Sequence, residues 1–410
     1  MLTDKPRLFL GLELNPDFAM ISSCTELKKE PETISRINGS EQYQIPMTIC
    51  KRKGIGQWFY GDDVSRSATE DVVVVDDLYR RALSGEEIRV EDSVYQAEEL
   101  LALFVRKVLM LPRRLGNQLE IAKLVVTVPA LLPGSVAVLK RILKQNELKE
   151  EQIHLVDNRE SFYYYALSQT EDLYLHDVAL FDLTDGILKF CVLSRNERTT
   201  PQTIQIAEKN YGMLYRDLDE MFTGVIEDAF AHRIVSATYL TGDGFDSSWM
   251  KESLRVLCRG RKAFLGRNLY SKGACYAALV KGNEKPWNFV YMGENELKLN
   301  VSVKVRDERE MSFLTLLTAG ESWYDAAGSV EVILNGKPEI DFWLQEPQSR
   351  EAKIQSVELL DFPEREEKTS RLRISAKPES DRKIRVSVKD LGFGEIVRAT
   401  EKTWEYVINE

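Results

Sequence analysis

Three short loops at the ends of strand-like segments carry carboxylates, hydroxyls or glycines that could hold a phosphate or a metal ion. Backbone N–H groups converge at such strand ends, and carboxylates placed there can bind magnesium or orient a water molecule. The candidate side chains are Glu13, Asn15 and Asp17 in the first loop, Asp182, Thr184, Asp185 and Gly186 in the second, and Gly242, Asp243, Gly244 and Phe245 in the third. Glu13 and Asp182 are the residues that we expect to hold magnesium and water.

Each loop taken alone also has a simpler structural explanation. Asp185-Gly186 is typical of a hairpin turn, and Gly242 and Gly244 could simply let a strand pass into the next element. A phosphate site is therefore indicated only if the three loops, which lie far apart in the sequence, meet in the folded chain.

Composition narrows the classes of partner. The chain has 410 residues and a formal net charge of -10, with 55 basic and 65 acidic side chains intermixed. This balance argues against nucleic acid or anionic membrane as the main partner. Five widely spaced cysteines and three isolated histidines form no zinc-ligand pattern. No signal peptide and no membrane-spanning run is recognisable, so we expect a cytoplasmic protein with reduced thiols.

Residues 1–282 alternate between strand-like and helix-like segments, which predicts an α/β architecture. We find no internal repeat in this region. The predicted strands are Arg7–Leu14, Phe18–Ser23, Leu124–Val128, Val178–Asp182 and Ala237–Leu240, and the predicted helices are a segment opening at Ser93, Pro133–Leu148, Leu214–Ala231 and Ser271–Leu279, the last with a small-residue face for close packing.

The pattern changes after a polar segment at Asn283–Trp287, which we interpret as a linker. From Leu297 onward apolar and polar residues alternate with a period of two, and Asn335-Gly336 is a strong hairpin signal. We find no long helical pattern in this part of the chain. Residues 290–410 are therefore expected to form an all-β antiparallel sandwich with one solvent-exposed face.

The order of motifs resembles the nucleotide-binding domain of the seventy-kilodalton heat-shock chaperones, within the actin-like ATPase superfamily. The segment Val125-Val126-Thr127-Val128-Pro129-Ala130 before a helix matches best, followed by the Gly242 loop and the small-residue helix at Ser271. The resemblance implies an α/β actin-like ATPase core over residues 1–282, ATP or ADP with Mg²⁺ as ligand, and a peptide-binding sandwich over residues 290–410. It further implies that Glu13 and Asp182 act in catalysis and that the other loop residues line the nucleotide.

Several departures from that family bear on activity. Pro16 has no N–H to offer a phosphate in the first loop, and Thr184 and Asp185 replace glycines in the second. Asp182 and Thr241 lie too close in sequence to enclose the family's small adenine-covering subdomain, so the second half of the core is expected to be reduced. The helical lid of the family has no counterpart here.

Two functions remain open from the sequence. The first is a divergent chaperone-like protein that has lost efficient ATP hydrolysis and acts as a protein-binding or scaffold module through its sandwich. The second is an active Mg-ATP-dependent chaperone-like ATPase that binds extended peptide segments. The altered phosphate loops favour the first, because hydrolysis needs the phosphate contacts and the metal together.

Overall fold

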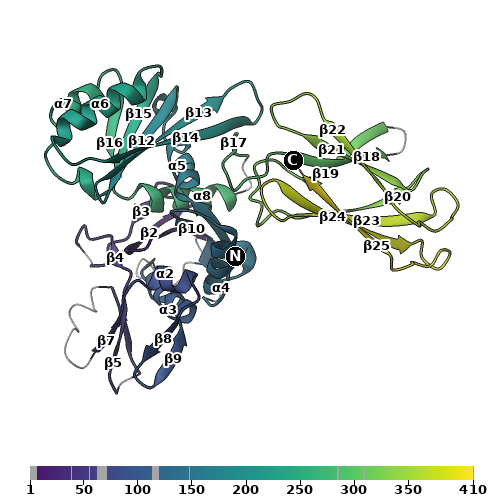
Figure 1. Ribbon diagram of the computed structural model, residues 1–410, viewed down its shortest axis with the longest axis horizontal. Helices are drawn as coiled ribbons and strands as arrows, with labels where there is room; N and C mark the ends of the chain where they lie inside the picture. The colour runs from purple at the N-terminus through teal and green to yellow at the C-terminus, as the bar shows by residue number, and fades with distance from the viewer. Residues whose placement is uncertain are drawn as a thin grey trace. The chain divides into compact units, whose positions relative to one another are not determined.

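The computed structural model describes residues 7–37, 39–54, 56–61, 72–112, 120–146, 148–283, 286–307 and 310–409. The chain folds as two compact units. One is formed by Met1–Arg195 together with Ile206–Trp287, and the other by Asn196–Gln205 together with Asn288–Glu410. Figure 1 labels the helices and strands of both units.

The first sheet of the first unit has the strand order β11-β10-β1-β2-β3, with β4 also paired to β2. These strands are β1 (Arg7–Leu14), β2 (Phe18–Thr25), β3 (Glu32–Thr33), β4 (Ile45–Pro46), β10 (Glu120–Val128) and β11 (Ile153–Asp157). β1 runs antiparallel to β2 and parallel to β10. The apolar run of β1 is buried almost throughout, as expected of a strand covered on both faces.

The second sheet has the order β16-β15-β12-β13-β14-β17. Its strands are β12 (Asp177–Thr184), β13 (Ile187–Asn196), β14 (Gln202–Met213), β15 (Val235–Thr241), β16 (Lys262–Leu265) and β17 (Phe289–Tyr291), of which β17 and the first residues of β14 belong to the second unit. β12 is antiparallel to β13 and parallel to β15, and β15 is parallel to β16, so these four strands have the same order and pairing directions as β2, β1, β10 and β11 in the first sheet. The two sheets therefore share a strand arrangement, although no internal repeat is recognisable in the sequence.

Helices and short hairpins complete the first unit. The helices are α2 (Leu78–Leu83), α3 (Ala97–Leu109), α4 (Pro133–Lys144), α5 (Asn158–Leu167), α6 (Leu218–Phe230), α7 (Glu252–Leu257) and α8 (Leu269–Lys281), with 3-10 turns η2 (Glu150–Gln152), η3 (Glu171–Leu173) and η4 (Asp243–Phe245). Five strands form two small sheets: β5 (Ile49–Arg52), β6 (Trp58–Tyr60) and β7 (Val72–Val75), and β8 (Glu87–Val90) with β9 (Ser93–Gln96). The helix predicted to open at Ser93 begins at Ala97 instead, because Ser93–Gln96 pairs with β8.

Helix α8 packs unusually closely on its neighbours. A Cβ added to Gly11 of β1 would lie 2.2 Å from the backbone nitrogen of Cys275, and one added to Gly273 would lie 2.1 Å from the carbonyl oxygen of Ser161. The predicted small-residue helix is thus confirmed, and its glycine and alanines allow backbones to approach. This contact places the first turn of α8 beside the end of β1.

The second unit contains two four-stranded antiparallel sheets. Their orders are β19-β18-β21-β22 and β20-β23-β24-β25. The strands are β18 (Asn300–Asp307), β19 (Glu310–Leu317), β20 (Gly328–Leu334), β21 (Glu339–Gln345), β22 (Lys353–Glu358), β23 (Ser370–Pro378), β24 (Lys383–Gly392) and β25 (Thr403–Asn409). Alternate residues such as Val303, Phe342, Ile374 and Val386 form one shared apolar core.

The predicted fold class, an α/β actin-like ATPase core with a reduced second half, is wrong. The structure is 22% helical and 43% strand and is divided among many small sheets, so it is strand-rich rather than a clear α/β core. The sequence interpretation gave too little weight to the short strands between Glu32 and Gln96 and to the long β13–β14 pair. Most of those strands are either too short or too polar to stand out from loops by their pattern, and so only part of the strand content was predicted.

Candidate functional site

Glu13 is a carboxyl group buried at the end of β1. Glu13 is only 3% exposed, and its Oε2 has no hydrogen-bond partner among the residues that the structure describes. Asn15 lies 3.5 Å away, from Nδ2 to Oε1, and the backbone N–H of Ser271 donates to the Glu13 carboxyl group. Ser271 lies in the first turn of α8, so Glu13 lies beside the N-terminus of that helix.

Asp182 occupies the corresponding position near the end of β12. The hydroxyl of Tyr270, the residue before Ser271, donates to its Oδ2 at 2.9 Å, and the hydroxyl of Thr184 donates to its Oδ1 at 2.6 Å. The first turn of α8 therefore contacts both carboxyl groups, through Ser271 on one side and Tyr270 on the other. The two strand ends that the sequence predicted to meet are joined by this turn.

The electrostatics of this pair favour a proton on Glu13. Burial raises the pKa of Glu13, the charge of Asp182 raises it further, and the hydrogen bonds from Asn15 and Ser271 offset only part of the rise, leaving a pKa of about 8. Burial and Asp182 likewise raise the pKa of Tyr270 well above its ordinary value. The charge of Asp182 disfavours a second negative charge on the buried Glu13, so the proton stays on Glu13.

The backbone N–H groups of the β1–β2 turn already donate hydrogen bonds within the turn. The side-chain oxygen of Asn15 accepts from the N–H of Asp17 at 3.0 Å and from that of Phe18 at 2.8 Å. The N–H of Asn15 donates to the carbonyl of Phe18 at 3.0 Å, and Pro16 has no N–H. The Asn15 side chain thus accepts the backbone N–H groups that would donate to a phosphate in a phosphate loop.

The β12–β13 turn is closed in a related way. Asp185 and Gly186 have φ angles of 51° and 74°, which makes the turn a tight hairpin connection. The N–H of Asp185 donates to Oδ1 of Asp243 at 3.3 Å. A carboxylate of the third loop therefore occupies the side of this turn where a nucleotide phosphate was expected.

The glycines of the third loop are required by packing against the second. Gly242 has a φ of 97°, and a Cβ there would lie 2.2 Å from the carbonyl oxygen of Leu183. A Cβ on Gly244 would lie 2.3 Å from Cγ of the same leucine. Phe245 is buried against Phe222 and Trp249, and the indole N–H of Trp249 donates to the carbonyl of Gly244 at 2.8 Å. This loop is filled by its own side chains.

The predicted site residues therefore form two groups. Glu13, Asn15, Asp182 and Thr184 lie around the first turn of α8, whereas Asp185 contacts Asp243 and the glycines of the third loop pack on Leu183. Asp17 is exposed at the first turn. Sequence reasoning missed Tyr270, which precedes the recognised small-residue helix, and gave no role in the site to Ser271, the first residue of that helix.

Arg80 of α2 is a further residue that the sequence analysis missed. Its hydrogen bond to Asp77, together with the charges of Asp77, Asp17 and Asp185, raises its pKa. Its guanidinium thus interacts electrostatically with a carboxylate from each of the two hairpin turns.

The residues present do not fit a magnesium ion. Within the described ranges no group of three or more His, Cys, Asp or Glu side chains is arranged to hold a metal. Asp182 already accepts hydrogen bonds at both oxygens, and Glu13 retains a proton at neutral pH. Magnesium is usually bound through one or two ionised carboxylates and several waters, whereas here one carboxyl group keeps its proton and the other already accepts two hydrogen bonds.

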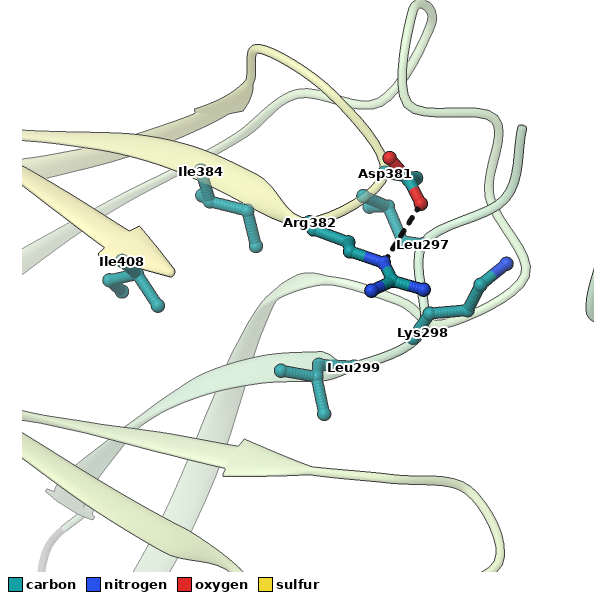
Figure 2. A pocket seen from close by; sticks show the side chains of 7 residues that line it. All are labelled: Leu297, Lys298, Leu299, Asp381, Arg382, Ile384 and Ile408. Atoms are coloured by element: carbon teal, nitrogen blue, oxygen red, sulfur yellow. Dashed lines mark ion pairs between the residues drawn. The ribbon is translucent and has the colours of Figure 1, made fainter. Parts of the chain in front are cut away.

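The second unit contains a small hollow at one end of its two sheets (Figure 2). It is lined by Leu297, Lys298, Leu299, Asp381, Arg382, Ile384 and Ile408. The Nε of Arg382 lies 3.5 Å from Oδ2 of Asp381. Four of the lining residues are aliphatic and belong to or border the sandwich core, so the hollow marks where the core reaches the surface.

Comparison with known families divides the chain at nearly the same place as the structure does. A model described as "Family of unknown function (DUF5716) C-terminal" matches residues 30–294. The chain belongs to this family. A second model, a domain of unknown function (DUF8552), matches residues 296–409. No curated protein matches.

The two family models match the first unit and the sandwich separately, and neither description names an activity. Neither matching model is a chaperone or actin-like ATPase family. The resemblance to the heat-shock chaperones therefore stays a prediction. None of the described helices of this family member has both the length and the apolar character needed to cross a membrane.

Proposed function

We propose that this protein is a non-hydrolytic scaffold module that acts by binding another protein through its C-terminal sandwich. The observation that carries the proposal is the use of Asn15 and Asp243 to occupy the turn N–H groups that a phosphate would need. Binding of a nucleotide would have to break these hydrogen bonds and displace a carboxylate. That cost weighs against nucleotide binding at this site.

The carboxyl pair supports a structural role for the same region. Phosphoryl transfer requires a metal ion, phosphate contacts and an oriented nucleophile together. Glu13 keeps its proton at neutral pH and lies beside the first turn of α8, and Asp182 is held by hydrogen bonds from Tyr270 and Thr184. Their role in this proposal is to join the two sheets through α8.

The expectation that the sandwich binds a protein is supported by the outward face of the sheet β19-β18-β21-β22. On that face Met311 is 51% exposed, Phe313 is 50% exposed and Ile354 is 48% exposed. Clusters of exposed apolar side chains on one face are typical of sites that another protein covers. The expectations of a cytoplasmic location, and of no nucleic-acid or membrane partner, remain predictions from charge and sequence.

Sensitive measurement of phosphate release from Mg-ATP, comparing the unmodified chain with Asp182→Asn, tests the loss of hydrolysis. We expect equal release from both proteins, at the background rate of the preparation. Turnover by the unmodified chain that Asp182→Asn abolishes would instead support the Mg-ATP-dependent alternative and overturn the proposal. The asparagine is nearly isosteric and can still accept from Tyr270, so the comparison does not depend on unfolding.

A further inference from the structure

The two outward faces of the sandwich differ in chemistry. On the sheet β20-β23-β24-β25, outward side chains form ion pairs, such as Arg373 with Glu331 at 2.7 Å and Arg385 with Glu405 at 3.2 Å. The sheet β19-β18-β21-β22 instead carries an apolar strip that consists of Met311, Phe313, Trp343 and Ile354. A charged and paired face is the usual state of a solvated sheet, so the apolar strip needs an explanation.

The strand register places these side chains together. Phe313 pairs with Lys304, Ser302 with Trp343, and Trp343 with Ile354 across neighbouring strands. Residues directly opposite each other point to the same face of a sheet. The Phe313 and Trp343 rings meet edge to face with centroids 5.0 Å apart. The strip therefore crosses the sheet and ends at the edge strand β19.

The edge of β19 is open along its first part. Among the described strands only β18 pairs with it, so its other side presents backbone N–H and C=O groups. A Cβ on Gly328 would lie 1.8 Å from the carbonyl oxygen of Leu316, which shows that β20 closes over the last part of β19. From Met311 to Leu317 the strand contains no charged residue and no proline, the usual protection of an edge.

The described charged side chains nearest to β19 on the strip's face are positive, whereas Glu310, the first residue of β19, lies on the opposite face of the sheet. Lys304 and Arg306 of β18 are exposed on the strip's face, Arg306 directly opposite Met311, and Lys304 lies with Nζ 5.4 Å from the centre of the Trp343 ring. The carboxylates Glu339 and Asp341 lie on β21, further from β19, and Asp341 accepts a hydrogen bond from Ser356 at 2.5 Å. Arg306 and Lys304 thus favour an acidic partner at this edge.

We propose that β19 accepts an extended acidic segment of a partner protein as an additional strand. Its backbone would pair with the open edge, its carboxylates would lie on the face that carries Arg306 and Lys304, and its alternate apolar side chains would lie on the opposite face beside Leu314. Such strand addition obtains affinity from the main chain and selectivity from alternate side chains. A second copy of this chain fits less well, because it would bring two sets of the same cations to one edge. The inference rests on the proposed protein-binding function.

Fluorescence anisotropy with a short fluorescein-labelled peptide of alternating valine and glutamate tests this inference. We expect saturable binding that the double variant Lys304→Glu with Arg306→Glu weakens roughly fivefold or more, since exposed charge pairs contribute up to about 1 kcal/mol each. A peptide with lysine in place of glutamate should not bind. Ile333→Glu on the edge strand β20 is the matched control, because Ile333 is 51% exposed and lies on the other sheet.

Three results would overturn the inference: no binding of the acidic peptide, equal binding of the lysine peptide, or an equal loss in Ile333→Glu. Sedimentation that shows a dimer dissociated by Phe313→Glu would assign the edge to a second copy instead. Failure here is distinct from failure of the proposed loss of hydrolysis, because phosphate release from Mg-ATP does not depend on β19.

Discussion

The hydroxyl of Tyr270 donates a hydrogen bond of 2.9 Å to the carboxylate of Asp182, and this bond links the first turn of α8 to the end of β12. Ser271, the next residue, contacts the β1 side of the same unit: its N–H donates to Glu13, and its Oγ lies 2.9 Å from Oγ of Ser22. Two consecutive residues of one helix thus connect the two sheets. Residues predicted to bind a nucleotide serve here as anchoring points for that helix.

Removal of the Tyr270 hydroxyl should destabilise the first unit. Tyr270→Phe leaves Asp182 without one hydrogen bond to a charged acceptor, which costs about 1.5–3 kcal/mol. Urea unfolding followed by tryptophan fluorescence measures this loss. Tyr215→Phe, at an exposed position, is the control and should leave the unfolding midpoint unchanged. Equal stability of the two variants would show that the hydrogen bond does not hold α8.

Glu13 should make the free energy of unfolding decrease as pH rises. Its pKa is raised from 4.5 to about 8 in the folded chain, so between these values the folded state binds its proton more tightly than the unfolded state. The contribution is present below pH 4.5 and is lost as pH rises to about 8, by at most about 5 kcal/mol. Glu13→Gln should remove this decline in urea titrations across that range.

The matched control for that series is Glu41→Gln, at an exposed position. It should retain the full pH dependence of the unmodified chain. If Glu13→Gln kept the same decline, some other group would be the source, and the proton would not reside on Glu13.

Substitution of Gly242 should show whether this glycine is required for packing on Leu183 rather than for contact with a nucleotide. Gly242→Ala places a Cβ 2.2 Å from the carbonyl oxygen of Leu183 at a φ of 97°, and we expect a loss of about 2 kcal/mol or more without any nucleotide present. Gly224→Ala, within helix α6 and with nothing near its added Cβ, should stabilise by about 0.5–1 kcal/mol. Thermal unfolding compares the two. A neutral Gly242→Ala would mean that the loop is not packed as described.

The sandwich depends on a buried ion pair between Arg365 and Asp390. Burial alone would raise the pKa of Asp390, but hydrogen bonds from Arg365, from the N–H of Gly392 and from Thr400 lower it below its ordinary value. Arg365→Leu leaves this carboxylate buried without its cation, at a cost of about 3–5 kcal/mol. Arg371→Leu, an exposed partner of Glu331, should have little effect on the melting temperature. Equal melting temperatures of the two variants would show that the Arg365–Asp390 ion pair does not stabilise the sandwich.

The sequence predicted single elements better than their assembly. The period of two after Leu297 marks strands because one face of each is buried, and the glycine and alanines of α8 mark close packing because nothing larger fits. By contrast, Asn15 and Asp243 were interpreted as ligand contacts, since a sequence does not show that a side chain bonds to a turn N–H nearby in space. Tyr270 was missed because its partner Asp182 lies 88 residues away. The strand content was missed where strands are too short to have a period.

The central claim is that the three turns are closed to a nucleotide, and calorimetric titration with Mg-ATP tests it most directly. We expect no binding heat up to millimolar ligand for the unmodified chain, and the same result for Asp182→Asn. A saturable heat that disappears in Asp182→Asn would contradict the claim, because it would show that Asn15 and Asp243 yield their turn N–H groups to a phosphate.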